Sequence, residues 1–406
     1  MTIRTISTKA LAISNFIESN VDSIFVITAS IDLEGSTVKM PANSKLVFKS
    51  GGKLYNGVFR GQKAMNDYLD IQWFSQSSEA NVNSLEAAIA WNNNILVSCT
   101  CTLNSEYTIY DSGIRIFGLH PDVSVIQSPA NSNIVTNLIH LAPEISYITI
   151  ENVTLRGYVP QSSSSDLRKT TASYLLKAFG KNTYITLRGC VFESATGGVF
   201  ILPNSRHITI EGCVFRKMVF VVSQGSGGYG VVFHESDDGK GSDHIIIRNC
   251  IFEKTVIRHA FYLQSSNDVL IENNIIYGTT QFNNSTLVDK FYQHAINPSA
   301  PALTATEIAS IDVEKHMTKF DSAISNRGCA NIRITNNCFQ DGLIILNGSN
   351  GAPSNTVKGR FFLLKENVIK NYCIPNYNTH PALYNWDSID DYRLVNNNEI
   401  NITYSS

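Results

Sequence analysis

Residues 207–215 read HITIEGCVF, and the same nine-residue pattern recurs along the chain. In this segment Ile208 and Ile210 are two residues apart, which is the period of a β-strand and not of a helix. A strand of this size cannot bury its apolar side alone, so repeated copies must stack. The pattern therefore predicts a solenoid. Its other copies are YITIENVTL (147–155), YITLRGCVF (184–192), HIIIRNCIF (244–252), DVLIENNII (268–276), NIRITNNCF (331–339), FFLLKENVI (361–369) and, more loosely, YRLVNNNEI (392–400).

One position in the pattern forms a column through the predicted stack. It is occupied by Val153, Cys190, Cys213, Cys250, Asn274, Asn337, Asn367 and Asn398. The shortest intervals are 23 and 24 residues, so longer intervals are the same coil with loop insertions. A coil of this length holds three short strands and three turns. The prediction is an all-β chain folded as a right-handed parallel β-helix, because no leucine ladder or helical period runs through the copies.

The composition of the chain limits which partners and locations are expected for it. The chain has 406 residues, is 43% apolar and carries a formal net charge of −2. Neither nucleic acid nor an anionic membrane is an expected partner for such a balance. No apolar run approaches the roughly 20 residues of a membrane span. The start MTIRTISTKALAIS lacks the features of a secretory leader. A removed leader, or release after assembly in the cytoplasm as in a virion component, would both fit an extracellular or virion-associated protein.

The cysteines suggest packing more than cross-linking. Cys190, Cys213 and Cys250 fall in the predicted column, where small buried side chains fit better than disulfides or metal ligands. Cys99 and Cys101 lie two apart on a strand-like stretch, so a zinc or redox pair remains an alternative there.

The N-terminal part is expected to differ from the stack. Residues 1–69 read as a small β module or a set of irregular coils, and residues 70–406 as the β-helix domain. A helix is predicted over Ser84–Trp91, with Asn83 or Ser84 as N-cap and Leu85, Ala88 and Ile89 on one face. This helix would cover the open end of the first coil, which otherwise exposes unpaired strand groups.

A partly helical insertion is predicted at about residues 279–320. Within it, Thr304 and Glu307 have the spacing of a capping box, followed by Ile308 and Ile311 on one stripe. The insertion either walls a groove or shields the flank.

The segment after residue 70 carries a family resemblance. A Trp73-Phe74 pair, the helix SLEAAIA (84–90), the strand IRIFG (114–118) and the stacked coils resemble pectate-lyase-like β-helix proteins, particularly bacteriophage tailspikes. The resemblance covers roughly residues 70–400. SQSSEANVN (75–83) departs from it, because the family often has a glycine-aspartate-glycine stretch there. The family includes lyases, hydrolases and binders of polysaccharide, and tailspikes work as homotrimers.

The resemblance also implies where a ligand would lie, namely along the third strand of each coil. Those strands are expected in GVFIL (198–202), GVVFHE (230–235), HAFYLQ (259–264), SAISNR (322–327) and GLIILN (342–347). Alternation then places His234, Gln264 and Arg327 in one outward row and Val232, Tyr262 and Ser325 in the next. Lys177 is expected to point outward in an earlier coil. The rings of Phe200 and Tyr262 suit sugar faces, Arg258 and His259 stand at a strand entrance, and acidic groups approach from loops at Glu235, Asp237, Asp238 and Asp321.

Two reactions are compatible with these residues. β-Elimination on a uronic acid polymer needs a base, for which His234, Lys177 or Tyr262 are candidates, and a cation for the enolate charge, for which Arg327 or Arg258 are candidates. Ca²⁺ held by Asp237 and Asp238 would be an optional cofactor. Hydrolysis needs two carboxyl groups, which would have to come from Glu235, Asp237, Asp238 and Asp321. A row that is merely solvated, in a non-catalytic structural or adhesive spike, is the third alternative.

Overall fold

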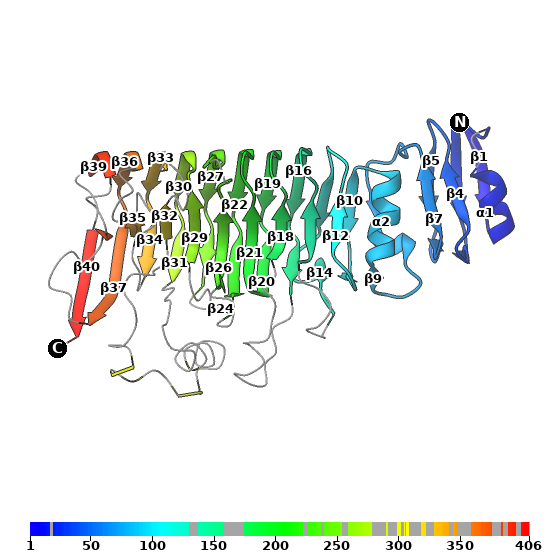
Figure 1. Cartoon of the computed structure of the whole chain (residues 1–406). Coiled ribbons are helices and arrows are strands. Elements are labelled where there is room, and N and C mark those ends of the chain that lie inside the picture. Colours follow the sequence, from blue (N-terminus) through cyan, green and yellow to red (C-terminus); the bar gives the residue numbers. More distant parts are fainter. Residues whose placement is uncertain are drawn as a thin grey trace.

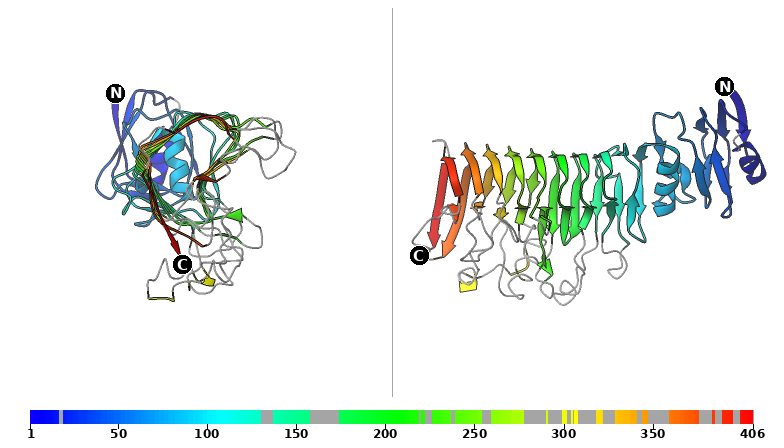
Figure 2. Two further views of the ribbon diagram at one scale, coloured as in Figure 1. Left: turned by 90° about the vertical axis from the view of Figure 1, so that its left-hand side faces the viewer. Right: turned by 45° about the horizontal axis from the view of Figure 1, so that its top comes forward.

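The computed structural model is a solenoid with a smaller module at its N-terminal end (Figure 1). It describes residues 1–16, 19–129, 137–157, 174–218, 220–221, 226–236, 239–253, 259–277, 290, 299–301, 304, 306–307, 318–321, 329–340, 344–346, 359–375, 383–384, 389–394 and 399–405. Seen end on, the coils superpose on one another (Figure 2). The predicted all-β, parallel β-helix architecture is confirmed.

Three long parallel sheets run along the solenoid, and each coil from β10 (Asn94–Val97) to β38 (Leu383–Tyr384) contributes a strand to each sheet. The coil that begins at β8 (Leu69–Asp70) has helix α2 (Val82–Trp91) in place of a third strand. The first sheet contains the predicted repeats. Its strands are β8 (Leu69–Asp70), β10 (Asn94–Val97), β13 (Arg115–Gly118), β16 (Ser146–Glu151), β19 (Thr183–Arg188), β22 (Arg206–Glu211), β27 (Asp243–Arg248), β30 (Asn267–Glu272), β33 (Ala330–Thr335), β36 (Gly359–Lys365) and β39 (Ile389–Leu394).

The second sheet follows the first after a short turn in every coil. Its strands are β9 (Ala80–Asn81), β11 (Thr100–Thr102), β14 (Val125–Gln127), β17 (Thr154–Arg156), β20 (Val191–Ala195), β23 (Val214–Met218), β28 (Ile251–Phe252), β31 (Ile275–Tyr277), β34 (Cys338–Gln340), β37 (Val368–Pro375) and β40 (Glu399–Ser405). Its inward rings Phe192, Phe215 and Phe252 stack with centroids 4.9 and 4.7 Å apart inside the solenoid.

The third sheet closes each coil. Its strands are β12 (Tyr107–Ile109), β15 (Ile139–Leu141), β18 (Tyr174–Ala178), β21 (Gly197–Ile201), β26 (Tyr229–Phe233), β29 (His259–Gln264), β32 (Thr318–Asp321), β35 (Ile344–Leu346) and β38 (Leu383–Tyr384). A two-stranded antiparallel ribbon, β24 (Phe220–Val221) with β25 (Ser226–Gly227), lies between β23 and β26 in the chain.

The predicted column lies at the turn between the first and second sheets. Cys190, Cys213 and Cys250 are fully buried and stacked coil upon coil, since Val214 N donates to Cys190 O and Ile251 N to Cys213 O. The residue before each column position from Val153 to Asn367 adopts a left-handed φ, for example +53° at Asn152 and +59° at Gly189. Asn and Gly tolerate this conformation best, which explains why they precede the column at all of these positions except Glu366. The described cysteine side chains, Cys99 and Cys101 included, are free thiols.

The N-terminal module consists of parallel pairs that resemble short coils. Its strands and helix are β1 (Thr2–Ile6), α1 (Lys9–Asn15), β2 (Ser23–Ile27), β3 (Ser30–Asp32), β4 (Thr37–Met40), β5 (Lys45–Phe48), β6 (Lys53–Tyr55) and β7 (Val58–Gly61). β1 pairs with β2 and β2 with β5, while β3 pairs with β6 and β4 with β7. The first coil of the solenoid begins at β8, next to the boundary predicted at residue 69.

A helix lies between the module and the first coil. It is α2 (Val82–Trp91), which follows the 3₁₀ turn η1 (Ile71–Phe74). The predicted apolar face of Leu85, Ala88 and Ile89 is buried, but the predicted N-cap is wrong. Asn81 caps the helix, and Ser84 is the third helical residue of a capping box. The strand pair β9–β11 extends to Asn81 and so sets where the helix begins.

Most of the predicted insertion lies outside the described residues. Its capping box is present, because Glu307 N donates to Thr304 Oγ1 (3.3 Å) and Thr304 N donates to Glu307 Oε2 (2.7 Å). The predicted end at residue 320 is wrong, since Thr318–Phe320 already belong to strand β32 of the third sheet.

Candidate functional site

The outer face of the third sheet carries a row of aromatic and cationic side chains. Backbone pairing joins Lys177 to Phe200, Phe200 to Val232 and Val232 to Tyr262 in successive coils. Lys177 is partly exposed, as predicted, and Val232 and Tyr262 share a row, but Val232 is buried with 2% exposure. Upstream, the same row begins with Thr108 and His140. The row therefore follows the solenoid axis over at least six coils.

Phe200 is the centre of this row. Its ring centroid lies 4.5 Å from that of Tyr174 and 5.7 Å from that of His234. The Lys177 ammonium is 5.7 Å from the Phe200 ring and 5.0 Å from the Phe179 ring, which is within cation–π range. Phe200 remains partly exposed, and Phe179 is 37% exposed. These residues form a surface on which flat apolar faces with hydrogen-bonding edges could pack.

Next to Phe200 the outer face becomes buried. Gln264 is 3% exposed and links two neighbours, because its Nε2 donates to Tyr262 Oη (2.9 Å) and its Oε1 accepts from Glu235 N (3.3 Å). Glu235 is 2% exposed, and its carboxylate accepts from Ser265 Oγ. The expectation of a solvent-facing Gln264 and a loop-borne Glu235 approaching the ligand is wrong. Both hold the strand ends of β26 and β29 together.

His259 also lies in this buried part. It is the first residue of β29 and is 2% exposed. Its ring centroid is 5.5 Å from Tyr229 and 5.6 Å from Tyr262. His234, at the end of β26, stays partly exposed, and its Nδ1 lies 2.7 Å from the carbonyl oxygen of Glu235. Of the two histidines, only His234 has access to a ligand on this face.

The register predicted for the next coil is wrong. Gln264 pairs with Asp321, and Leu263 pairs with Phe320, so Asp321 occupies the backbone position assigned to Arg327. The error arose because Ile324 and Phe320 are both apolar, and alternation alone cannot choose between them. Arg327, Arg258, Asp237 and Asp238 lie outside the described residues, and only the backbone of Asp321 is described.

Sequence reasoning missed an imidazole–carboxylate pair at the upstream end of the row. His140 Nε2 lies 3.5 Å from Glu106 Oε2, and Glu106 Oε1 accepts from the backbone and side chain of Asn137 (3.0 and 3.2 Å). Burial lowers the pKa of His140, the nearby Lys177 lowers it further, and Glu106 opposes both. The imidazole is therefore neutral at pH 7. The strand IHL (139–141), which precedes the first clear repeat, was the available signal.

Metal ligands do not gather in the part of the chain that the structure describes. No group of three His, Cys, Asp or Glu side chains there is arranged to hold an ion. The Ca²⁺ predicted at Asp237 and Asp238 concerns two residues outside that part.

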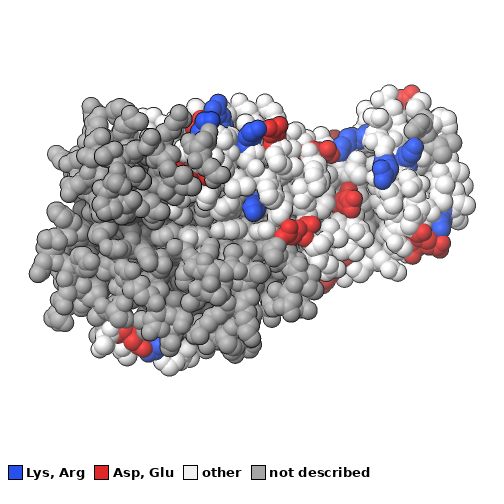
Figure 3. Space-filling model, viewed as in Figure 1, with Lys and Arg blue, Asp and Glu red and all other residues white. Residues whose placement is uncertain are grey.

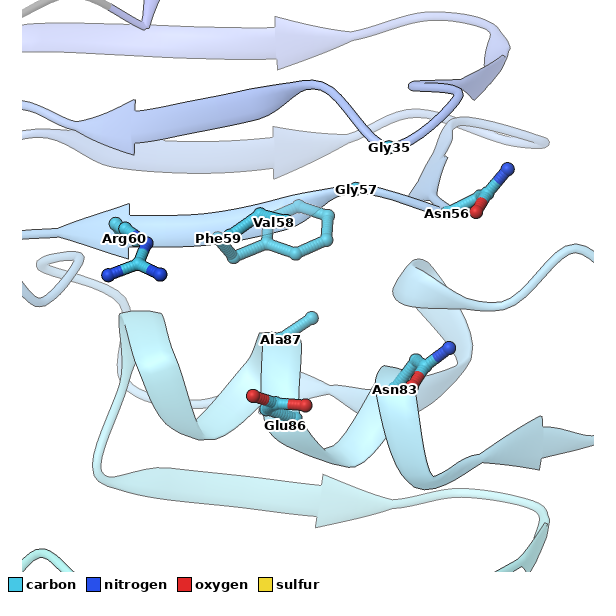
Figure 4. A pocket seen from close by; sticks show the side chains of 9 residues that line it. All are labelled: Gly35, Asn56, Gly57, Val58, Phe59, Arg60, Asn83, Glu86 and Ala87. Atoms are coloured by element: carbon cyan, nitrogen blue, oxygen red, sulfur yellow. The ribbon is translucent and has the colours of Figure 1, made fainter. Parts of the chain in front are cut away.

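A separate hollow of about 490 Å³ lies at the N-terminal junction (Figure 4). Phe59 and Arg60 of β7 face Glu86 and Ala87 of α2 across it. It is built where the module meets the helix that covers the first coil, and it has no part in the row on the third sheet.

The comparisons with known proteins agree with this architecture. Residues 125–285 match the family model described as "Right handed beta helix region". These residues therefore have the right-handed β-helix fold, and the same parallel sheets continue on both sides of them. No curated protein matches this β-helix. In the part of the β-helix that the structure describes, no helix is long and apolar enough to cross a membrane.

Several solved structures are similar to this β-helix. The catalytic domain of a GH87 alpha-1,3-glucanase in complex with nigerose is 10% identical with a TM-score of 0.43, over 82% of this chain and 68% of that one. An alginate lyase from Paenibacillus sp. str. FPU-7 is 9% identical with a TM-score of 0.39, over 96% and 99%. The Dettilon tailspike protein is 10% identical with a TM-score of 0.40, over 83% and 68%.

Proposed function

We propose that this β-helix binds a polysaccharide along the outer face of the third sheet, between Lys177 and Tyr262. The observation that carries the proposal is the cluster around Phe200. Lys177 and Tyr174 contact its ring from the coil before, and His234 from the coil after. A sugar has an apolar face and a hydroxyl-bearing edge, which match exposed aromatic rings flanked by hydrogen-bonding side chains.

The spacing of the row supports a polymeric ligand. Adjacent strands are about 4.8 Å apart, which is about the length of one sugar ring, and the partly exposed Lys177, Phe200 and His234 belong to three successive coils. A chain of sugars lying along the axis would contact several coils at once. Such a ligand suits the expectation of an extracellular or virion-associated protein that recognises surface glycans, in the manner of a tailspike.

A binding test isolates the role of Phe200. We expect Phe200→Ala to weaken glycan binding at least tenfold, because stacking on an aromatic ring is lost. Phe117→Ala is the matched control. Phe117 is also a partly buried phenylalanine on an outer face, with the Arg115 guanidinium 4.5 Å from its ring, but it lies on the first sheet. Retention on a glycan array followed by titration calorimetry measures both. Equal binding by the two variants would remove the third sheet as the site.

A second candidate function is cleavage by β-elimination, which the neutral His140 favours. A neutral imidazole beside a cation can accept a proton, and Lys177 directly follows His140 in the row. His140 is 7% exposed and its Nε2 is buried against Glu106, so this reaction requires the substrate to reach a largely covered imidazole. The outward row from Thr108 to Tyr262 holds no carboxylate, which disfavours hydrolysis on this stretch. A secreted lyase or hydrolase and a non-catalytic homotrimeric spike remain the other proposals.

Three measurements separate these alternatives. Absorbance growth near 235 nm on uronic acid polymers indicates elimination, and reducing ends without it indicate hydrolysis. If elimination occurs, His140→Gln should abolish it while leaving glycan retention intact. The elimination rate of the wild type should fall only below the usual pH range of histidine titration, because the pKa of His140 is lowered. Glycan retention with neither product indicates a binder, and light scattering decides whether it is a trimer.

A further inference from the structure

The first sheet carries a second exposed feature, a row of stacked rings. Tyr147, Tyr184, His207 and His244 occupy the second position of β16, β19, β22 and β27, and each has a left-handed φ between 55° and 60°. Successive ring centroids are 4.8, 4.6 and 4.7 Å apart. Tyr147 is 61% exposed and Tyr184 is 45% exposed. We call these four residues the ring row.

An open groove of about 290 Å³ lies beside the ring row. Its floor is formed by outward residues that pair in register, Thr186 with Thr209, Thr209 with Ile246, Ile246 with Leu270 and Leu270 with Arg333. Two residues further along the strands runs a ladder of ion pairs that joins Glu151, Arg188, Glu211 and Arg248, with contacts of 3.2, 3.3 and 2.9 Å. The groove thus follows the solenoid axis, with the ring row on one side and the ladder of ion pairs on the other.

The groove offers hydrogen bonds without net charge. Because Tyr184 stacks between its neighbours, its ring face is covered and its edge and hydroxyl point outward. Threonine hydroxyls add donors and acceptors on the floor. Asp268 compensates the charge of Arg333, which lies 3.6 Å from one carboxylate oxygen, and its other oxygen lies 3.6 Å from His244 Nε2. The ion-pair ladder compensates itself in the same way.

We infer that this groove binds an uncharged, linear oligosaccharide, with one sugar ring over each coil. The floor joins the hydroxyls of Thr186 and Thr209 to the apolar side chains of Ile246 and Leu270, which suits the hydroxyl-bearing edge and apolar face of a neutral sugar. The coil advance of about 4.8 Å matches a single ring. The site lies on a different sheet from the row around Phe200, so it does not depend on the function proposed there.

Other occupants fit the groove less well. Nucleic acid requires an excess of Lys and Arg, which the ion pairs remove. Strand addition by a peptide needs a free sheet edge, but β19, β22 and β27 are paired on both sides. A second copy of the chain would need a larger apolar interface core than Ile246 and Leu270 supply beside the threonines of the groove floor.

Blocking the floor tests the inference. We expect Thr209→Trp to weaken binding of a neutral oligosaccharide at least tenfold, because the indole fills the space above the strand. Val214→Trp is the matched control, since Val214 is equally half-buried and lies on the second sheet of the same coil. The probes are hexasaccharides of α-1,3-, β-1,3- and β-1,4-linked glucose, titrated by calorimetry, with circular dichroism to confirm that both variants fold.

The result supports the inference if at least one hexasaccharide binds, Thr209→Trp weakens it, and Val214→Trp and Phe200→Ala do not. Absence of binding by all three probes, or equal binding by Thr209→Trp and the wild type, would overturn it. A change of oligomeric state in Thr209→Trp, seen by light scattering, would show that the groove is a protein interface and would also overturn it. If Phe200→Ala does not weaken glycan binding, only the proposal for the third sheet is contradicted.

Discussion

At the scale of single residues, Glu193 shows how a buried charge is held on this solenoid. It is 3% exposed, and Arg156 and Arg216 from the coils on either side donate to its carboxylate, Arg216 Nε at 2.6 Å. Burial alone would raise the pKa of Glu193, but the two arginine hydrogen bonds outweigh it and lower the pKa below the usual glutamate range. The folded state therefore favours the ionised form.

This lowered pKa predicts a pH-dependent contribution to stability. We expect Glu193→Gln to lower the free energy of unfolding by about 1 kcal/mol at neutral pH, since the arginine side chains are partly exposed and screened. The contribution is fully present above the glutamate pKa of the unfolded chain and is lost as pH falls through the lower folded-state pKa. Urea unfolding at neutral and successively acidic pH measures it.

Glu211→Gln is the control for this prediction. Glu211 bridges Arg188 and Arg248 in the same manner, but its side chain is 20% exposed, so the loss should be smaller. A wild-type advantage over Glu193→Gln that grows on acidification would contradict the assigned pKa direction.

At the scale of elements, α2 covers the end of the stack and its start depends on one side chain. Asn81 Oδ1 accepts from Ser84 N (3.1 Å), and Ser84 Oγ donates to Phe74 O (3.0 Å), which ties the helix to η1. At the other end of α2, Trp91 is fully buried and contacts Phe16 and Phe59 of the N-terminal module. The helix therefore joins the module to the first coil.

The capping residue of α2 can be tested with two asparagines. We expect Asn81→Ala to cost about 1 kcal/mol of stability, because a helix-terminal N–H loses its acceptor. Asn83→Ala should be neutral or slightly stabilising, because Asn83 is exposed within the helix and Ala has the higher propensity. Thermal or urea unfolding of both variants decides. A larger loss at Asn83 would assign the cap to one of the two residues, Asn83 and Ser84, that the sequence predicted.

At the scale of the whole molecule, a buried asparagine ladder connects the C-terminal coils. Asn337 is 1% exposed, its Oδ1 accepts from the backbone and side-chain nitrogens of Asn274 (both 2.9 Å), and its Nδ2 donates to Ile271 O and Asn367 Oδ1 (both 3.0 Å). At the other end Cys250 N donates to Asn274 Oδ1 (2.9 Å). Four coils thus share one hydrogen-bonded chain where cysteines end and asparagines begin.

Breaking this ladder should weaken contacts between coils more than a surface change does. We expect Asn337→Ala to lower the free energy of unfolding by about 3 kcal/mol, because several buried polar groups lose their partners together. Thr335→Ala, at a partly exposed position of the same coil, should stay within about 0.5 kcal/mol. If Asn337→Ala and Thr335→Ala lower the free energy of unfolding equally, water must satisfy the groups that the Asn337 amide bonded, at little cost in stability.

The two outer faces of the molecule differ in chemistry. The third sheet presents a cation and partly exposed rings at Lys177 and Phe200, whereas the groove on the first sheet combines threonine hydroxyls, apolar side chains and balanced charges. On the face shown in Figure 3, the described acidic and basic side chains are interspersed, without a single-sign patch. These faces can therefore be tested as separate sites.

The sequence by itself determined the solenoid, the coil length, the column of Cys and Asn, and the buried face of α2. These follow from local periods, since residues two apart on a strand and a turn of Asn or Gly recur in every copy. It also placed Lys177, Phe200 and Tyr262 on one face, because alternation within a strand decides which side chains point outward.

Only the tertiary structure decided which strands are neighbours after a long insertion and which outward residues are buried. Pairing of Gln264 with Asp321 depends on contacts between coils, and two apolar residues four apart satisfy the same alternation. The burial of Glu235, the His140–Glu106 pair and the ring row likewise arise from segments far apart in sequence. Lateral stacking creates these arrangements, and no local pattern encodes the lateral partner.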